Sequence, residues 1–317
     1  MCLYIEVRSK RLEVRKMTKR ICLYSLLVCW SLMLPRTASA GEREGVDFFC
    51  GADLNYKDVN LLRLYDVLFY LTPGVKWHIG HEWQLAGQLG LPIVNEGYDK
   101  KYNYVSLRNL SLAKQFHFGD KQHLKASGGL FSRHRYGIDV KWLYIVNNWL
   151  ALDAQCGFIG KYAAERVWGF DNMNTLTFMV GAKTYLQQWN TEFAVSGGRY
   201  IEKDFGIQGE VLRHFTHCTV SLFGQVHEKP SYVINGTRLA GGFRVVILLP
   251  DKHAGKGKIR LRPASNFRLT ADMNTERTLQ KMYYTDPEEN EREGWFSRDE
   301  VRWGANLMDE ERRVCHE

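Results

Sequence analysis

The sequence has little proline, no closely spaced cysteines and none of the short motifs that mark common catalytic or metal sites. Its 317 residues include 7 Pro and 7 Cys, and no CxxC pair occurs, which argues against zinc ribbons and redox dithiols. HExxH and GxSxG are absent, and none of the His residues has a second ligand at metal spacing. We therefore predict a protein that is not an enzyme and has no cofactor, no metal and no catalytic residues.

Long apolar runs are also missing after Gly41, so no membrane helix of about 20 residues is predicted there. The net charge of +8 does not predict a nucleic-acid partner, because most of it comes from one short segment. Residues 1–40 hold eight Lys/Arg against two Glu, which leaves the remainder close to neutral. The positive net charge of the whole chain therefore says little about the partners of residues 41–317.

The first 40 residues have the three parts of a secretory signal peptide. Lys19 and Arg20 form a positive start, residues 21–34 form an apolar run, and Ala38-Ser39-Ala40 fits a cleavage site. We predict a signal peptide over residues 1–40, with Met17 as the true start. A buried or anchoring helix is the alternative, and the apolar run is short for a membrane span.

Residues 41–250 instead contain glycine, aromatic residues and segments in which apolar and polar residues alternate. In TLTFMVGAKTYLQ one face carries Leu176, Phe178 and Val180, and the other carries Thr175, Thr177 and Lys183. WLALDAQCGFIGKY and HCTVSLFGQVHE repeat this period of two, which is typical of strands. These strands are about ten residues long, longer than the average of about five or six in globular proteins.

Long strands with one apolar and one polar face predict an all-β fold, a transmembrane antiparallel β-barrel of about 12 strands, with a range of about 10–14. Aromatic residues near predicted strand ends suit the girdles of such barrels. They are Trp77, Trp83, Trp142, Trp149, Tyr162, Trp168 and Tyr185. A soluble sandwich or barrel with an apolar interior is the alternative, because periodicity does not say which face points inward.

The composition changes after residue 250. Residues 251–317 hold 13 Lys/Arg and 14 Asp/Glu. We predict a charged C-terminal region, with room for a last hairpin in KIRLRPASNFRLTADM followed by a polar tail, and YTDPEENEREGWFSRDE as an exposed loop or tail.

Charged residues within the barrel region are predicted to line its lumen or rim. They are Arg133, Arg135, Arg199, Asp204 and Arg213. Two interpretations are open: these charges attract an anionic polymer, or they balance one another. In SGGRYIEKDFGIQGEVLRHF we predict a strand that ends near Gly197 and Gly198, a turn over residues 202–204 and a second strand over residues 205–215.

Three stretches together resemble the YjbH-like family of outer-membrane proteins linked to exopolysaccharide export. They are LKASGGLFSRHRYGIDVKWLYIVNNWLALDAQCGF, GGRYIEKDFGIQGEVLRHF and GGFRVVILLP, and they span residues 124–250. The resemblance implies an outer-membrane β-barrel in a Gram-negative bacterium that assists secretion or assembly of surface exopolysaccharide. It implies outer-membrane lipid as a partner, with polysaccharide and periplasmic export proteins as further candidates. A lipid-acting barrel enzyme and a structural or adhesive barrel are the alternatives.

Overall fold

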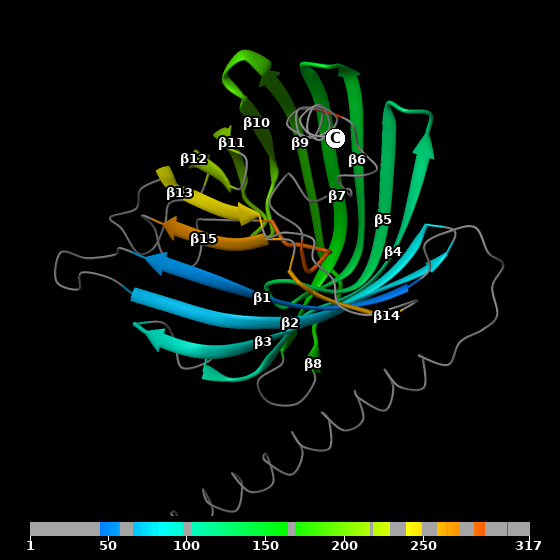
Figure 1. Ribbon diagram of the computed structural model, residues 1–317, viewed down its shortest axis with the longest axis vertical. Helices are drawn as coiled ribbons and strands as arrows, with labels where there is room; N and C mark the ends of the chain where they lie inside the picture. The colour runs from blue at the N-terminus through cyan, green and yellow to red at the C-terminus, as the bar shows by residue number, and fades with distance from the viewer. Residues whose placement is uncertain are drawn as a thin grey trace, which may run out of the picture. The chain divides into compact units, whose positions relative to one another are not determined.

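The computed structural model is built almost entirely of β-strands (Figure 1). It describes residues 45–57, 66–80, 82–97, 103–163, 169–215, 218–228, 239–248, 259–264, 266–272, 282–288 and 303. All of these residues belong to one compact unit, Arg43–Glu317. The signal peptide expected over residues 1–40, with its start at Met17, lies outside the described residues.

The described residues form fifteen strands and one short 3-10 helix, η2 (Gln187–Trp189). The strands are β1 (Gly45–Lys57), β2 (Asp66–Gly80), β3 (Trp83–Glu96), β4 (Ser106–Phe118), β5 (Gln122–Phe131), β6 (Arg135–Asn147), β7 (Leu150–Ala163), β8 (Gly169–Phe170), β9 (Thr175–Leu186), β10 (Thr191–Arg199), β11 (Phe205–His214), β12 (Cys218–His227), β13 (Leu239–Leu248), β14 (Ile259–Pro263) and β15 (Asn266–Asp272). The all-β prediction is confirmed. Within the described ranges, no helix is long and apolar enough to cross a membrane.

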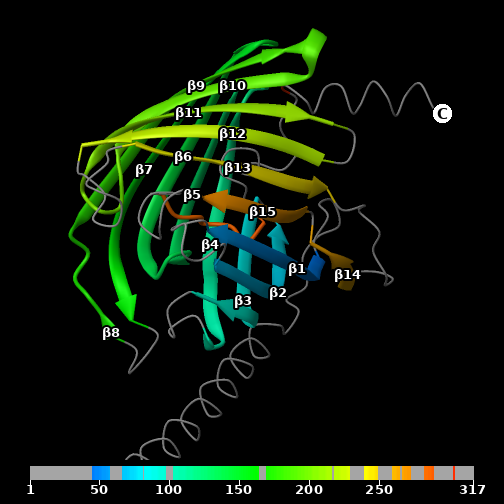
Figure 2. The ribbon, with the colours of Figure 1, turned by 90° about the vertical axis from the view of Figure 1, so that its left-hand side faces the viewer.

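The strands form one sheet in the order β14-β1-β15-β13-β12-β11-β10-β9-β7-β6-β5-β4-β3-β2, and β1 also pairs with β2. This order includes 14 strands, the upper limit of the predicted range, while β8 pairs only with β7 among the described strands. Neighbours are antiparallel except that β14 and β15 run parallel to β1. Figure 2 shows β9 to β13 as successive neighbours.

Alternation along these strands separates polar from apolar side chains, and it is the polar side chains that are buried. In β6, Asp139 and Lys141 are fully buried, whereas Ile138 between Gly137 and Asp139 is 60% exposed. In β9, Thr177 is fully buried and Val180 is 59% exposed. We call the face of Asp139, Lys141 and Thr177 the inner face and the opposite one the outer face. The structure therefore shows that the polar face points inward, a choice that the sequence periodicity left open.

The connections differ between the two ends of the strands. At one end, called the short-turn end, the chain turns at residues 81–82, 119–121, 148–149, 187–190 and 215–217. At the other, called the long-loop end, it connects through residues 58–65, 97–105, 132–134, 164–174, 200–204 and 228–238. Every strand from β1 to β13, apart from β8, therefore runs between an end with only tight turns and an end with mostly longer connections.

Several exposed aromatic side chains lie at the short-turn end. Trp83 begins β3 and Trp149 lies in the turn before β7, and both are exposed, as expected for the aromatic residues near strand ends. Phe118, Trp189 and Phe215 join them there. Tyr162 and Tyr185 also lie near strand ends, but they are buried. Trp77 and Trp142 lie within β2 and β6, and Trp168 is outside the described residues.

The strand region extends beyond residue 250, where the sequence suggested a last hairpin. Both expected strands form, as β14 and β15, but both pair with β1: Val46 faces Ile259 and Asp53 faces Arg268. They therefore follow one another along the same edge of β1 instead of forming a hairpin with each other. The backbone NH of Ala264, between them, donates to the carbonyl of Cys50 at 3.0 Å.

Candidate functional site: the polar inner face and the segment that covers it

Four of the five predicted lumen or rim charges lie at the long-loop end. Arg135 begins β6, is buried, and its Nη2 lies 2.8 Å from Oε1 of Glu202 in the β10–β11 connection. Arg133 lies in the β5–β6 turn with a φ of 61°. Arg199 ends β10, and Asp204 is buried in the connection that follows. The observed Arg135–Glu202 ion pair favours charge balance as the role of Arg135.

Arg213 differs from the other four. It is the second-to-last residue of β11, at the short-turn end, and it is exposed on the outer face. Its Nη1 donates to Oγ1 of Thr191 at 3.3 Å, and its guanidinium lies 5.8 Å from the centroid of the Phe215 ring. Arg213 is therefore a rim residue of the outer face and does not belong to the inner face.

The β10–β11 connection covers part of the inner face. β10 ends at Arg199 and β11 begins at Phe205, as the sequence predicted for this stretch. Tyr200 and Ile201 are buried, and the backbone NH of Tyr200 donates to the carbonyl of Asp204 at 2.8 Å. Lys203 takes a φ of 62° to complete the turn. The connection therefore bends toward the interior and brings Ile201 against residues of other strands.

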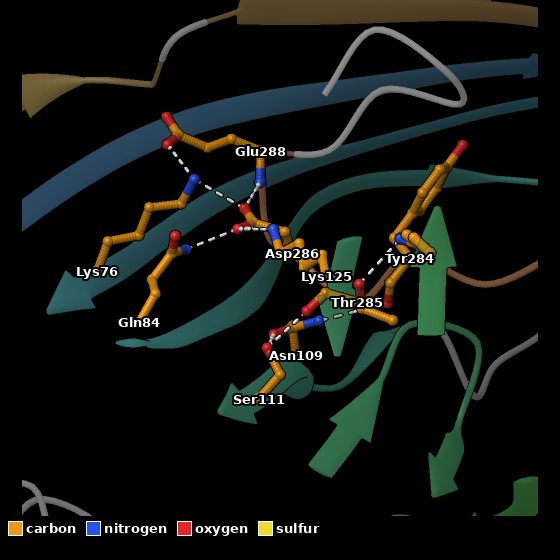
Figure 3. Close-up of polar contacts among 10 residues, drawn as sticks. Lys76, Gln84, Asn109, Ser111, Lys125, Tyr284, Thr285, Asp286 and Glu288 are labelled. Atoms are coloured by element: carbon orange, nitrogen blue, oxygen red, sulfur yellow. Dashed lines mark hydrogen bonds and ion pairs between the residues drawn. The ribbon is translucent and has the colours of Figure 1, made fainter. Parts of the chain in front are cut away.

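A short C-terminal stretch, Met282–Glu288, lies against the inner face. We call it the inner segment. Within it, Tyr283, Thr285 and Asp286 are each at most 5% exposed, although the sequence suggested that residues 284–300 are an exposed loop or tail. The reason is that the inner faces of β2 to β9 carry polar groups that bind its side chains and carbonyls. Figure 3 shows the contacts that side chains of β2 to β5 make with the inner segment.

At one end of the inner segment, three strands bind the carboxylate of Asp286. Lys76 Nζ from β2 lies 2.7 Å from Oδ1, and Lys125 Nζ from β5 lies 3.4 Å from Oδ2. Gln84 Nε2 from β3 donates to Oδ2 at 2.7 Å. Lys76 also pairs with Glu288 Oε2 at 2.9 Å. Two lysines therefore meet two carboxylates in a region with little access to water.

The middle of the inner segment is bound by hydroxyl, amide and ammonium groups. Ser111 Oγ donates to the carbonyl of Thr285, and Lys141 Nζ donates to Thr285 Oγ1 at 2.9 Å. The backbone NH of Tyr284 donates to Ser132 Oγ at 2.7 Å. Asn109 Nδ2 donates to the carbonyl of Tyr284 at 3.4 Å. Backbone groups of the inner segment thus find partners on β4 and on the β5–β6 turn, as buried polar groups require.

Tyr283 anchors the other end of the inner segment. Its hydroxyl donates to Oδ2 of Asp139 at 2.6 Å, and its ring stacks on Phe131 with centroids 5.2 Å apart. Phe131, Ile159, Ile201 and Tyr283 form one of two small buried apolar clusters. The apolar part of the interior is therefore organised around a residue of the C-terminal region.

The second apolar cluster contains Trp303. It packs with Leu143, Ile145, Ala151 and Tyr185, and its Nε1 donates to the carbonyl of Asn147 at 3.1 Å. These partners lie at the short-turn end, whereas Tyr283 contacts Phe131 and Ile201 toward the long-loop end. The described residues 282–288 and 303 therefore contact the inner face at positions along much of the strand length.

The electrostatics of Asp286 favour its ionised form. Burial alone would raise the pKa of this carboxyl, but the charges of Lys76 and Lys125 more than offset burial and hold the pKa well below its ordinary value. Hydrogen bonds from Lys76 and from the backbone NH of Glu288 act in the same direction. The carboxylate therefore stays charged and bound throughout the neutral and mildly acidic range.

We expect acid to weaken the binding of the inner segment, and only below about pH 4, the ordinary pKa of Asp. Below that pH the released segment binds more protons than the bound one, so stability is lost as the pH falls toward the bound-state pKa. The measurement is the ¹⁹F NMR shift of fluorotyrosine at position 283 as a function of pH. Asp286→Asn should flatten this pH dependence. An unchanged profile in that variant would mean that Asp286 is not the group that causes it.

A glycine makes room for Tyr283. A Cβ atom on Gly157 of β7 would collide with the Tyr283 hydroxyl. We expect Gly157→Ala to displace the ring and weaken binding of the inner segment by about 1–3 kcal/mol, the usual cost of overpacking. Protease sensitivity of residues 282–288 measures this. Gly209→Ala is the control, because no atom lies within 4 Å of the Cβ built there; equal effects of the two changes would contradict the prediction.

One cluster resembles the residue set that the lipid-enzyme alternative requires. His214 Nδ1 lies 3.1 Å from Thr219 Oγ1, and His214 Nε2 lies 3.6 Å from Glu192 Oε2. All three side chains are buried on the inner face, opposite the apolar face that a lipid chain would approach. The acid is also beyond the usual hydrogen-bond distance of about 3.2 Å. Among the described residues, no group of three or more His, Cys, Asp or Glu could hold a metal ion.

Comparison with known families identifies a related segment in the middle of the chain. Residues 95–223 match the family model YjbH, described as exopolysaccharide biosynthesis protein YbjH. The match contains the first two stretches on which the resemblance rested and begins before them, whereas the third, residues 241–250, lies outside it. No curated protein matches the chain. Over residues 95–223, from the end of β3 into β12, the chain is thus similar to the YjbH family of exopolysaccharide biosynthesis proteins.

Proposed function

We propose that this protein is an outer-membrane β-barrel that assists secretion or assembly of a surface exopolysaccharide. The observation that carries the proposal is the inverted burial pattern: polar side chains are buried on the inner face, and large apolar ones are exposed on the outer face. Examples of the exposed residues are Ile138, Val180, Val195, Ile207 and Leu222, each at least 57% exposed. Exposed apolar surface of this extent suits lipid.

The strand pairing supports a barrel. Each strand from β2 to β13, apart from β8, pairs with the next in the order, β13 pairs with β15, and β15 and β2 both pair with β1. Pairings that connect β2 and β15 through β1 support a barrel, because the core of a bilayer offers no hydrogen-bond partners to free strand edges; among the described strands, β14 pairs with β1 alone. The strands from β1 to β13, apart from β8, are 9–15 residues long, enough for the about 9–11 residues that a membrane strand needs.

The difference between the two ends supports an orientation. Outer-membrane barrels have short turns on the periplasmic side and longer loops outside. We therefore propose that the short-turn end faces the periplasm and the long-loop end faces the cell exterior. The exposed Trp83, Phe118, Trp149, Trp189 and Phe215 would then mark the periplasmic membrane interface, where aromatic side chains are favoured.

The link to exopolysaccharide rests on the family match over residues 95–223. A polar inner face rich in hydroxyl, amide and charged groups suits a hydrated sugar polymer better than a lipid. The protein would serve either as a passage for the polymer or as a docking platform for periplasmic export proteins. The buried position of Thr219, His214 and Glu192 makes the lipid-enzyme alternative the weaker candidate.

Two experiments test the proposal. The mature protein should fractionate with the outer membrane and migrate differently in gels before and after heating, as folded barrels do; recovery as a soluble periplasmic protein would contradict it. Deletion of the gene should lower surface polysaccharide, with lipid A composition unchanged. The reverse result, altered lipid A with unchanged polysaccharide, would favour the enzyme.

A further inference from the structure

The acidic end of the inner segment shows what its binding site recognises. The Asp286 carboxylate is bound by two ammonium groups, from Lys76 and Lys125, and by the carboxamide of Gln84. These three side chains come from β2, β3 and β5, with β4 between the last two, and the two lysines and Gln84 are at most 14% exposed. We call Lys76, Gln84 and Lys125 the carboxylate seat.

The ion pairs of the seat lysines join the seat to the inner segment. Lys76 pairs with Asp286 and Glu288, and Lys125 pairs with Asp286; both acids belong to the inner segment. Arg135 and Arg244, in contrast, pair with Glu202 and Glu210 of the β10–β11 region. If the inner segment left, the seat would lose these carboxylates, and a buried charge that loses its partner strongly favours another anion.

The groups next to the seat suit a sugar. Ser111 and Asn109 donate hydrogen bonds to carbonyls of the inner segment, and Lys141 donates to the hydroxyl of Thr285. Further along, Asp139 accepts from the hydroxyl of Tyr283. Donors and acceptors of this kind bind the hydroxyl groups of a sugar equally well. A carboxylate flanked by hydroxyl groups is the pattern of an acidic sugar residue.

We propose that the carboxylate seat binds a carboxylate-bearing sugar residue of the polymer, and that the inner segment occupies the seat when the polymer is absent. Asp286 then imitates the sugar carboxylate, and Thr285 and Tyr283 imitate neighbouring hydroxyl groups. The inference rests on the proposed function, because it takes the polar interior as the place where the polymer binds. It adds that the polymer is acidic and that the inner segment competes with it for the carboxylate seat.

The direct test measures binding of two oligosaccharides of equal length to the full chain in detergent: an oligogalacturonide, which is acidic, and a maltooligosaccharide, which is neutral. Asp286→Asn with Glu288→Gln should increase affinity for the acidic oligomer, because the competing segment is weakened. Adding Lys76→Met or Lys125→Met should reduce that affinity about tenfold or more, the loss expected for a buried hydrogen bond to a charged group.

The matched control is Lys183→Met. Lys183 is a buried inner-face lysine of β9, so its loss changes the interior charge equally but leaves the seat intact, and affinity should change little. Equal binding of the neutral oligomer, binding that survives loss of both seat lysines, or an equal loss in Lys183→Met would each overturn the proposal.

A second measurement keeps the charges of the segment intact. With the other cysteines replaced by serine, Thr285→Cys should react slowly with a maleimide, because position 285 is buried, and the acidic oligomer should accelerate the reaction. Unchanged labelling at saturating oligomer would count against competition for the seat. These assays use purified protein, so their failure is distinct from a failure of fractionation or of the deletion phenotype, which test the proposed function.

Discussion

Arginine in place of Val180 is expected to lower the free energy of unfolding in a lipid bilayer by about 2–4 kcal/mol, the cost of a cation at mid-depth on the lipid face of a barrel. Val180 is central in β9 and 59% exposed on the outer face. In a soluble protein the same change on an exposed surface would stay within about 0.5 kcal/mol. Denaturant titration of the protein folded in vesicles measures the difference.

Leu176→Arg is the control for depth. Leu176 lies on the same face of the same strand, one residue from its start, where the cost should fall to about 0–1 kcal/mol near the membrane interface. Similar small effects at both positions would contradict the membrane orientation of the outer face. A large effect at Leu176 and a small one at Val180 would contradict the proposed depth of β9.

Asp286→Ala is expected to weaken binding of the inner segment by about 3–5 kcal/mol, the cost of removing one partner from a buried ion pair. Lys125, which is 3% exposed, would lose its contact with Asp286 at 3.4 Å, whereas Lys76 would keep Glu288. Faster hydrogen exchange at the Tyr284 amide, which donates to Ser132 Oγ, reports the change.

Two further variants make that result specific. Glu288→Ala should have a smaller effect, because Lys76 keeps Asp286 at 2.7 Å. Lys125→Met combined with Asp286→Ala should recover part of the loss, because it removes a charge left without that acid. Unchanged exchange at Tyr284 in Asp286→Ala would mean that the carboxylate does not hold the segment.

Much of the sheet could be predicted from the sequence because alternation is a local property. Thr175, Thr177 and Lys183 are on one face and Leu176, Phe178 and Val180 on the other, as period two requires. The strand boundaries around residues 200–204 were also predictable, because the glycines, the aspartate and the charges there are typical turn residues. The face on which Arg213 lies was less predictable, because a charged side chain near the end of a strand can reach water from either face of the sheet.

The inner segment could not be found in this way. Tyr283, Thr285 and Asp286 lie in a stretch whose charges and proline are typical of an exposed loop. Their partners Lys76, Ser111, Lys125 and Asp139 are distant in sequence: the Gln84–Asp286 hydrogen bond joins residues 202 positions apart. The one available signal was indirect: long strands with a charged face need polar partners if that face is enclosed.

The sequence by itself determined that this chain forms long, two-faced strands, because backbone geometry places successive side chains on opposite sides whatever their surroundings. It also contained the stretches that resemble the YjbH family. Only the tertiary structure decided that Asp139, Lys141 and Thr177 are inside and Val180 outside, and that Asp286 rests between Lys76 and Lys125. Burial and ion pairing depend on which surfaces meet, and that is settled by the curvature of the whole sheet and the path of the C-terminal region.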